Sequence, residues 1–294
     1  MAYGTPASPD DVERYYTDIR RGRPPSPEQL QHLKGRYDAI GGTSPLAERT
    51  EAQRARLQAA LDERAPGRCT VVLGQKHSPP FIEDAAARLA DQGVRTIVGL
   101  VLAPHYSGAS VGEYQQRLAE AAEPRGVTAV PIGSWHLLPE YIDFLAGAVA
   151  EARATLPADH KVLFTAHSLP ERVLAGDPYP DQLLASATQV AAAAGLAHGA
   201  GWSIAWQSAG ATPEPWRGPD VLEVIGELGA TGRAAAVCVC PQGFVSDHLE
   251  VLYDLDVEAT QVAAEAGLAF ARTRVLNDDA VVLGALAERV LALA

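Results

Sequence analysis

The sequence has few cysteines and no long apolar run, and each shortage excludes a class of protein. Its three cysteines, Cys69, Cys238 and Cys240, are an odd number without the spacing of metal ligands, which argues against a disulfide framework or a zinc site. No stretch approaches the roughly eighteen apolar residues of a membrane span, and Met1 is not followed by a secretory leader. We therefore expect a soluble, cytoplasmic protein with reduced thiols.

Positive charge is also scarce. The 294 residues include 24 Lys and Arg against 36 Asp and Glu, a net charge of −12, which argues against broad binding of nucleic acid or anionic membranes. A local cluster of positive charge therefore suggests a specific anionic ligand. The segment DIRRGRPPSPE contains such a cluster, formed by Arg20, Arg21 and Arg23. Guanidinium groups bind carboxylates bidentately. The alternative is a solvated, charged helix end.

From Cys69 onward, Val- and Ile-rich runs alternate with Ala-rich segments of helical period, which predicts parallel strands joined by crossover helices. We expect strands at 69–73, 95–102, 127–132, 160–166, 202–206, 234–240 and 267–271. Helices are expected near 80–91, 110–123, 138–155, 181–195, 219–229, 247–255 and 278–293. The pattern is that of a doubly wound α/β chain with two similar sheets, whose ligand binds beyond the carboxyl ends of the strands.

The first sixty residues differ, because they are helical in period and rich in arginine. They open on MAYGTP, which is typical of a loop that leaves a strand, yet no strand precedes it. Either the true start lies upstream, or this half lacks an edge strand.

Three carboxylates follow one another in PQGFVSDHLEVLYDLDVE. Glu250, Asp254 and Glu258 are spaced i, i+4, i+8, which stacks them along one side of a helix. They repel one another unless a metal ion or protons lie among them. The alternative is a capping box, with Asp247 as N-cap and Glu250 at the third helical position.

A histidine lies at the end of another predicted strand. His167 follows the apolar run 162–166 in LFTAHSLPER, and strand 234–240 leads similarly into the helix of Glu250, so the two side chains are expected to face each other. Imidazole and carboxylate together suit a borderline ion such as Fe²⁺, and either accepts a proton near neutral pH. The alternative is a histidine satisfied by the local backbone.

Other polar side chains are expected at the same carboxyl ends of the strands, where they could line the ligand site. Lys76 and His77 follow strand 69–73, although such loops are commonly polar without function. Tyr3 has a phenol that can hydrogen-bond or ligate a metal. The segment from Trp206 to Asp220, WQSAGATPEPWRGPD, is typical of a long functional loop that borders a flat ligand.

At these residues the chain resembles the ferrochelatase family. The segments are MAYGTP, YYTDIRRGRPPSPE, RYDAIGGTSPLAERT, QKHSPPFIEDA, VLAPHYS, TAHSLPE, GDPYPDQL, WQSAG, TPEPWRGPD and GFVSDHLEVLYDLDVE, in the family's order. They run from residue 1 to beyond 258 and are most similar to the soluble coproporphyrin ferrochelatases of Gram-positive-type bacteria.

The resemblance implies two Rossmann-like, chelatase-like halves, 1–158 and 159–294, with a porphyrin cleft between them and the last helix packed back on the first half. It implies a lyase of haem biosynthesis that inserts Fe²⁺, as substrate, into coproporphyrin III to give coprohaem. The alternatives are a protoporphyrin IX ferrochelatase, a cobalt chelatase acting on sirohydrochlorin-type rings, or a tetrapyrrole carrier without catalysis.

Site residues carry over by position. His167 and Glu250 match the family's catalytic pair, which also offers ligands to Fe²⁺. Tyr3 matches a residue on the opposite porphyrin face. An outer hydrated-metal site, which could hold Mg²⁺, is matched by Asp254, Glu258, Arg36, Ser44 and Gln53, and the porphyrin-lining positions by Arg20, Arg21, Lys76, His77 and Ser208.

The chain also departs from its relatives. The family's opening strand is absent before Met1, and no cysteine follows Cys240, where some relatives ligate a [2Fe–2S] cluster. The dimerising extension of animal-type enzymes is missing too. We therefore expect a monomer without a resident cofactor, which contacts neighbouring haem-pathway enzymes transiently and binds neither nucleic acid nor membrane.

Overall fold

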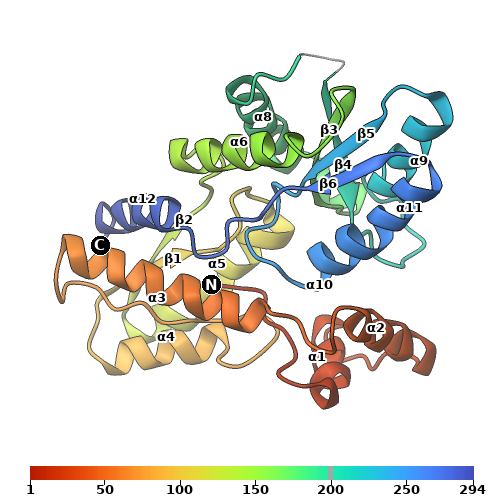
Figure 1. The fold of residues 1–294 in the computed structure, drawn as a ribbon. Coiled ribbons are helices and arrows are strands. Elements are labelled where there is room, and N and C mark those ends of the chain that lie inside the picture. The colour runs from red at the N-terminus through yellow and green to blue at the C-terminus, as the bar shows by residue number, and fades with distance from the viewer. Residues whose placement is uncertain (198–200) are drawn as a thin grey trace.

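The computed structural model describes residues 1–197 and 201–294 as an α/β protein with two parallel sheets (Figure 1). The smaller sheet pairs β1 (Thr96–Leu100) with β2 (Thr128–Ile132). The larger has the order β4-β3-β5-β6, formed by β3 (His160–His167), β4 (Trp202–Gln207), β5 (Ala236–Cys240) and β6 (Ala269–Arg272). The predicted fold class, parallel sheets flanked by helices, is confirmed.

Helices surround both sheets. Those of the first part are α1 (Val12–Ile19), α2 (Pro27–Ala39), α3 (Leu46–Arg64), α4 (Ile82–Asp91), α5 (Glu113–Ala122) and α6 (Pro139–Arg153). Those of the second are α7 (Glu171–Leu174), α8 (Tyr179–Ala193), α9 (Val221–Thr231), α10 (Leu249–Val251), α11 (Thr260–Glu265) and α12 (Ala280–Leu291), with a π-helical stretch, Leu252–Ala259, between α10 and α11. In the described part of the chain, no helix is long and apolar enough to cross a membrane.

The larger sheet is buried on both faces. Val162 and Phe164 of β3 belong to one apolar cluster, with α6, α8 and α12, whereas Leu163 belongs to another, with α9 and α11. Alternate residues of a strand point to opposite faces, so β3 reads as a continuous apolar run because helices cover both sides. Cys238 and Cys240 lie fully buried in the first cluster.

The last helix returns to the first part of the chain. Figure 1 shows α12 along α3, and Leu283 and Leu286 of α12 share one core with Leu57 and Leu61 of α3. An ion pair, Arg64 Nη2 to Glu288 Oε1 at 3.3 Å, lies on the rim of this contact. The two parts of the chain thus share a core.

The prediction of a strand at 69–73 was wrong. This segment joins no ladder with the described residues. One of its edges is bound by α3, where Gln58 Oε1 accepts from Val71 N at 2.7 Å and Gln58 Nε2 donates to the Cys69 carbonyl at 3.1 Å. Its inner edge faces β1 across a cavity of about 400 Å³. A strand needs a partner on at least one side, and the sequence pattern could not show that no strand in residues 1–197 and 201–294 pairs with this segment.

Candidate active site

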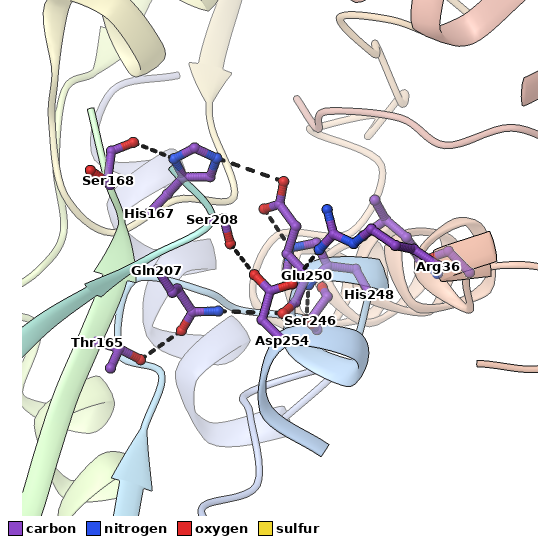
Figure 2. Close-up of polar contacts among 12 residues, drawn as sticks. Arg36, Thr165, His167, Ser168, Gln207, Ser208, Ser246, His248, Glu250 and Asp254 are labelled. Atoms are coloured by element: carbon purple, nitrogen blue, oxygen red, sulfur yellow. Dashed lines mark hydrogen bonds and ion pairs between the residues drawn. The ribbon is translucent and has the colours of Figure 1, made fainter. Parts of the chain in front are cut away.

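The site is built at the carboxyl edge of the larger sheet. His167 is the last residue of β3, in register with Gln207 at the end of β4, and Glu250 lies in α10 beyond the end of β5. His167 Nε2 lies 3.6 Å from Glu250 Oε1 (Figure 2). The two side chains are 35% and 32% exposed, so a ligand can reach them. The structure brings together the pair that the sequence singled out.

The charges of this pair are coupled. Burial alone would lower the pKa of His167, but the Glu250 carboxylate and the Ser168 carbonyl, which accepts a hydrogen bond from Nδ1, raise that pKa to about 9. Burial opposes ionisation of Glu250, yet His167 and His248 hold its pKa well below the usual value. The resting pair is therefore an imidazolium beside a carboxylate.

Sequence reasoning missed a second histidine. His248 Nε2 lies 3.6 Å from Glu250 Oε2, on the side of the carboxylate away from His167. His248 is the N-cap residue of α10, with φ −157°, and Glu250 lies in the first turn of that helix. Sequence spacing gave no signal for the contact, because residues two apart on a regular helix do not face each other.

The capping-box alternative was wrong. His248, not Asp247, occupies the N-cap of α10, and its side chain makes no capping hydrogen bond. Asp247 instead accepts from Asn277 Nδ2 at 2.8 Å and lies 3.5 Å from Arg272 Nη2. These partners come from the loop after β6 and from β6 itself, which local sequence does not predict.

The backbone of Glu250 is tied to the sheet. Gln207 Nε2 donates to the Glu250 carbonyl at 3.3 Å, and Thr165 Oγ1 donates to Gln207 Oε1 at 2.8 Å. Gln207 and Thr165 are buried. This chain of hydrogen bonds, drawn in Figure 2, fixes α10 against β3 and β4 and was not foreseen.

Asp254 lies one turn further along and is 5% exposed. It accepts hydrogen bonds from Arg36 Nη2 and from Ser208 Oγ. Burial, with the charges of Glu250 and Glu258, raises its pKa to about 6, although Arg36 and Ser208 oppose the rise. Arg36 reaches Asp254 because α1 and α2 pack against α10 through Val12, Tyr37 and Leu249.

Two residues of the predicted outer site are engaged elsewhere. Gln53 is buried, and its Nε2 donates to the Val245 carbonyl, Ser246 Oγ and the Asn277 carbonyl at 3.2, 3.0 and 2.9 Å. Ser44 Oγ accepts from Leu46 N at 3.2 Å. Within residues 1–197 and 201–294, no group of three or more His, Cys, Asp or Glu side chains is arranged to hold a metal ion.

Three predicted porphyrin-lining residues gather near the N-terminus. The Tyr3 ring meets the His77 ring edge-on at 4.6 Å, and His77 Nδ1 lies 2.6 Å from Asp18 Oδ1 of α1. Burial lowers the pKa of His77, which Asp18 opposes. Lys76 is 11% exposed and pairs with Glu113, so its ammonium group is already neutralised.

The arginine cluster follows α1. Arg20 Nε and Arg23 Nε each donate to the other's carbonyl, at 3.2 and 3.3 Å, and Arg21 takes a left-handed conformation with φ 55°. Arg21 and Arg23 are exposed, and none of the three has a carboxylate partner in the part of the chain that the structure describes. Their charges are available to an anionic ligand.

The loop between β4 and α9 is ordered by specific contacts. Ser168 Oγ donates to the Arg217 carbonyl at 2.8 Å, and Arg217 N donates to the Leu169 carbonyl at 3.0 Å. Gly210 lies so close to the Trp216 ring that a Cβ there would come within 2.5 Å of it. The loop is thus held beside His167, and Ser208 at its start reaches Asp254.

Comparison with known proteins shows similarity along nearly the whole chain. The ferrochelatase family model matches residues 1–293. The chain is 45% identical over 298 residues to the coproporphyrin III ferrochelatase of Geobacillus kaustophilus, covering 99% of this chain and 93% of that one. It is 46% identical over 286 residues to the ferrochelatase of Herpetosiphon aurantiacus, with coverage of 95% and 92%.

Solved structures show the same fold. SirB from Bacillus subtilis with Fe³⁺ superposes with a TM-score of 0.55 at 16% identity, over 83% of this chain and 90% of that one. CbiX, the terminal enzyme of sirohaem biosynthesis in denitrifying bacteria, superposes with a TM-score of 0.53 at 17% identity, over 85% and 94%.

Proposed function

The chain belongs to the ferrochelatase family, and we propose that it inserts Fe²⁺ into coproporphyrin III to give coprohaem, acting in the cytoplasm. The observation that carries this proposal is the His167–Glu250 pair, 3.6 Å apart and open to solvent at the carboxyl edge of the larger sheet. Relatives named coproporphyrin III ferrochelatases, 44% identical in Bacillus subtilis over 99% of this chain, support the choice of porphyrin.

Metalation requires a place for two protons. The free porphyrin carries two N–H groups, and replacing them with Fe²⁺ releases two protons for each metal bound. His167 is protonated while it faces ionised Glu250, so it accepts a pyrrole proton only after giving up its own. An arriving dication provides the driving force, because it repels the imidazolium and takes its place beside the carboxylate.

Protons then need a route away from the pair. Glu250 is a weak base, whereas Asp254, with a pKa of about 6, changes charge close to neutral pH. Groups whose pKa lies near the working pH transfer protons efficiently. We assign Asp254 the relay of protons to Glu258 and solvent, with Arg36 and Ser208 holding it in place. Should Mg²⁺ bind at this outer position, it would compete with Arg36 for Asp254.

The porphyrin's carboxylates would meet the arginine cluster. Arg20, Arg21 and Arg23 lack acidic partners among the described residues, so binding a propionate there separates no existing ion pair. Coproporphyrin III has four propionates and protoporphyrin IX two. A cationic cluster thus favours the more acidic ring, by roughly 0.2–1 kcal/mol for each exposed pair.

One assay tests this function. The purified protein is supplied anaerobically with Fe²⁺ and with coproporphyrin III or protoporphyrin IX, and the Soret band is followed. We expect faster turnover of coproporphyrin III.

Variants test the role of the arginine cluster. We expect the double variant Arg20→Gln/Arg21→Gln to raise KM for coproporphyrin III about fivefold with kcat little changed. The control is Arg56→Gln, at an exposed arginine of α3, which should change neither KM nor kcat. Binding of the ring without metal insertion would instead identify a carrier.

A further inference from the structure

The short segment 245–248, which precedes α10, sets the position of Glu250. His248 Nδ1 lies 3.1 Å from the Ser246 carbonyl, which can only accept a hydrogen bond, so this nitrogen carries the hydrogen. The contact fixes the orientation of the imidazole ring, whose Nε2 faces Glu250 Oε2 at 3.6 Å. A shift of the backbone at 245–248 would therefore move His248 and the start of α10, and with them the carboxylate opposite His167.

One residue outside this segment binds it at three points. Asp247 N donates to Asn277 Oδ1 at 3.0 Å, and Asn277 Nδ2 donates to Asp247 Oδ2 at 2.8 Å. Asn277 N also donates to the Val245 carbonyl at 2.8 Å. Because an amide side chain both donates and accepts, Asn277 matches the N–H and the carboxylate of Asp247 together, and a displaced or rotated segment would lose both bonds.

The backbone of Asn277 is itself held in place. Its φ of 46° lies in the left-handed region, where glycine is the least strained residue and asparagine is tolerated. The Asn277 carbonyl accepts a hydrogen bond from Gln53 Nε2 of α3 at 2.9 Å. A glycine would satisfy the backbone at this position, so the asparagine amide supplies something that the turn itself does not need, namely the two bonds to Asp247.

A second contact, from β6, binds the chain after Glu250. Arg272 Nη2 lies 3.5 Å from Asp247 Oδ1, and the Nε and Nη2 of Arg272 donate to the carboxylate of Asp256 at 2.6 and 2.9 Å. Asp256 belongs to the π-helical stretch Leu252–Ala259, which follows α10. β6 and the loop after it thus bind the chain both before and after Glu250, and they restrain the element that carries its carboxylate.

We propose that Asn277 is a positioning residue for metal insertion, whose amide holds Glu250 opposite His167. It acts through Asp247 and the segment 245–248, and the inference rests on the proposed function because turnover is one of its two readouts. Catalytic groups that are held in place lose rate when their supports are loosened, since a displacement of about 1 Å can cost up to about 100-fold. Loss of the Asn277 amide should therefore lower kcat more than it changes the binding of porphyrin.

Two single variants separate positioning from stability. Asn277→Gly keeps the left-handed backbone and removes the amide. We expect kcat for coproporphyrin III to fall about tenfold, with KM changed less than about twofold. The control is Asp279→Ala in the same loop, which removes the carboxylate that caps α12. Asp279→Ala should also lower the melting temperature, because a helix cap is lost, but it should leave kcat unchanged.

An exchange of the two paired side chains tests the contact directly. Asn277→Asp alone places a second carboxylate beside Asp247 and should lower kcat at least as much as Asn277→Gly. The double variant Asp247→Asn/Asn277→Asp reverses the direction of the bond, because the new amide donates to the new carboxylate, which can still accept the backbone N–H at position 247. We expect the double variant to regain at least about half of the original kcat.

A measurement without turnover keeps this inference separate from the proposed function. Leu252 N donates to the His248 carbonyl at 2.9 Å, so the amide hydrogen exchange of Leu252 reports the order of α10. We expect Asn277→Gly to speed this exchange about tenfold and Asp279→Ala to leave it unchanged. Should the unchanged protein not metalate coproporphyrin III, the proposed function fails, and hydrogen exchange at Leu252 alone decides on Asn277.

Three results would overturn the role of Asn277. They are an unchanged kcat or unchanged hydrogen exchange in Asn277→Gly, equal losses in Asp279→Ala, and a double variant no more active than Asn277→Asp. Should Asn277→Gly not fold, the comparison of Asn277→Asp with the double variant decides.

Discussion

His167 Nε2 and Glu250 Oε1 lie 3.6 Å apart although they belong to β3 and α10, distant segments of the chain. Each residue has further polar contacts that position it: His167 with the Ser168 carbonyl, and Glu250 with His248 and Gln207. Because both side chains are positioned in advance, little conformational entropy is lost when they adopt the geometry needed for catalysis.

Replacing the histidine should abolish most turnover. We expect His167→Ala to lower kcat about 100-fold or more, because it removes the principal proton acceptor, while porphyrin binding, followed by Soret titration, stays near that of the unchanged protein. The matched control is His160→Gln at the opposite end of β3, where His160 bonds Arg153 and Pro157. Near-normal turnover of His167→Ala would reject the assignment.

The pair should also make stability depend on pH. The pKa of His167 is raised from 6.5 to about 9, so its contribution to folding is complete below about pH 6.5 and is lost as the pH rises through 9. We expect the difference in free energy of unfolding between the unchanged protein and His167→Gln to shrink over this range. The change should be on the order of 1 kcal/mol, since solvent screens a pair that is one-third exposed.

Chemical denaturation at pH 6.5 and at pH 9.5 measures this difference. Glu250→Gln serves as the control. In this background the carboxylate that pairs with His167 is absent, so His167→Gln should change the free energy of unfolding by nearly the same amount at both pH values. A difference that grows toward pH 9.5 would contradict the ion pair.

A variant of Asp254 distinguishes a role in proton transfer from a role in metal delivery. If it relays protons, Asp254→Asn should lower kcat about tenfold or more, and added imidazole buffer should restore part of the loss because it carries protons in place of the carboxylate. If it conveys iron, a higher concentration of Fe²⁺ should restore the rate and buffer should not. Because its pKa is about 6, we expect rescue by buffer.

Gln53 should prove structural. Its amide binds three acceptors in the loops after β5 and β6. Gln53→Leu removes these three hydrogen bonds and leaves the buried Ser246 hydroxyl without the bond it accepts, which should lower the free energy of unfolding by about 2–4 kcal/mol. Thermal unfolding measures this effect. Gln116→Leu, at an exposed position whose side chain bonds Glu120, should change stability little. Equal melting temperatures for the two variants would contradict the structural role.

The sequence by itself determined the family, the parallel α/β class and the edge of the sheet on which His167 lies. These depend on local properties, because the period of apolar residues sets the elements and a polar residue after a buried strand emerges at its carboxyl end. The ordered motifs carried the resemblance to ferrochelatases, which the comparisons confirm.

The tertiary structure alone decided which side chains and strands pair with one another. Arg36 meets Asp254 only because α2 packs against the segment after β5, and Asp247 binds Asn277 instead of capping α10. The segment 69–73 has the composition of a strand but forms no ladder with the described residues, because a cavity lies between it and β1. Ion pairs, caps and ladders need two groups brought together, and local sequence specifies only one of the two.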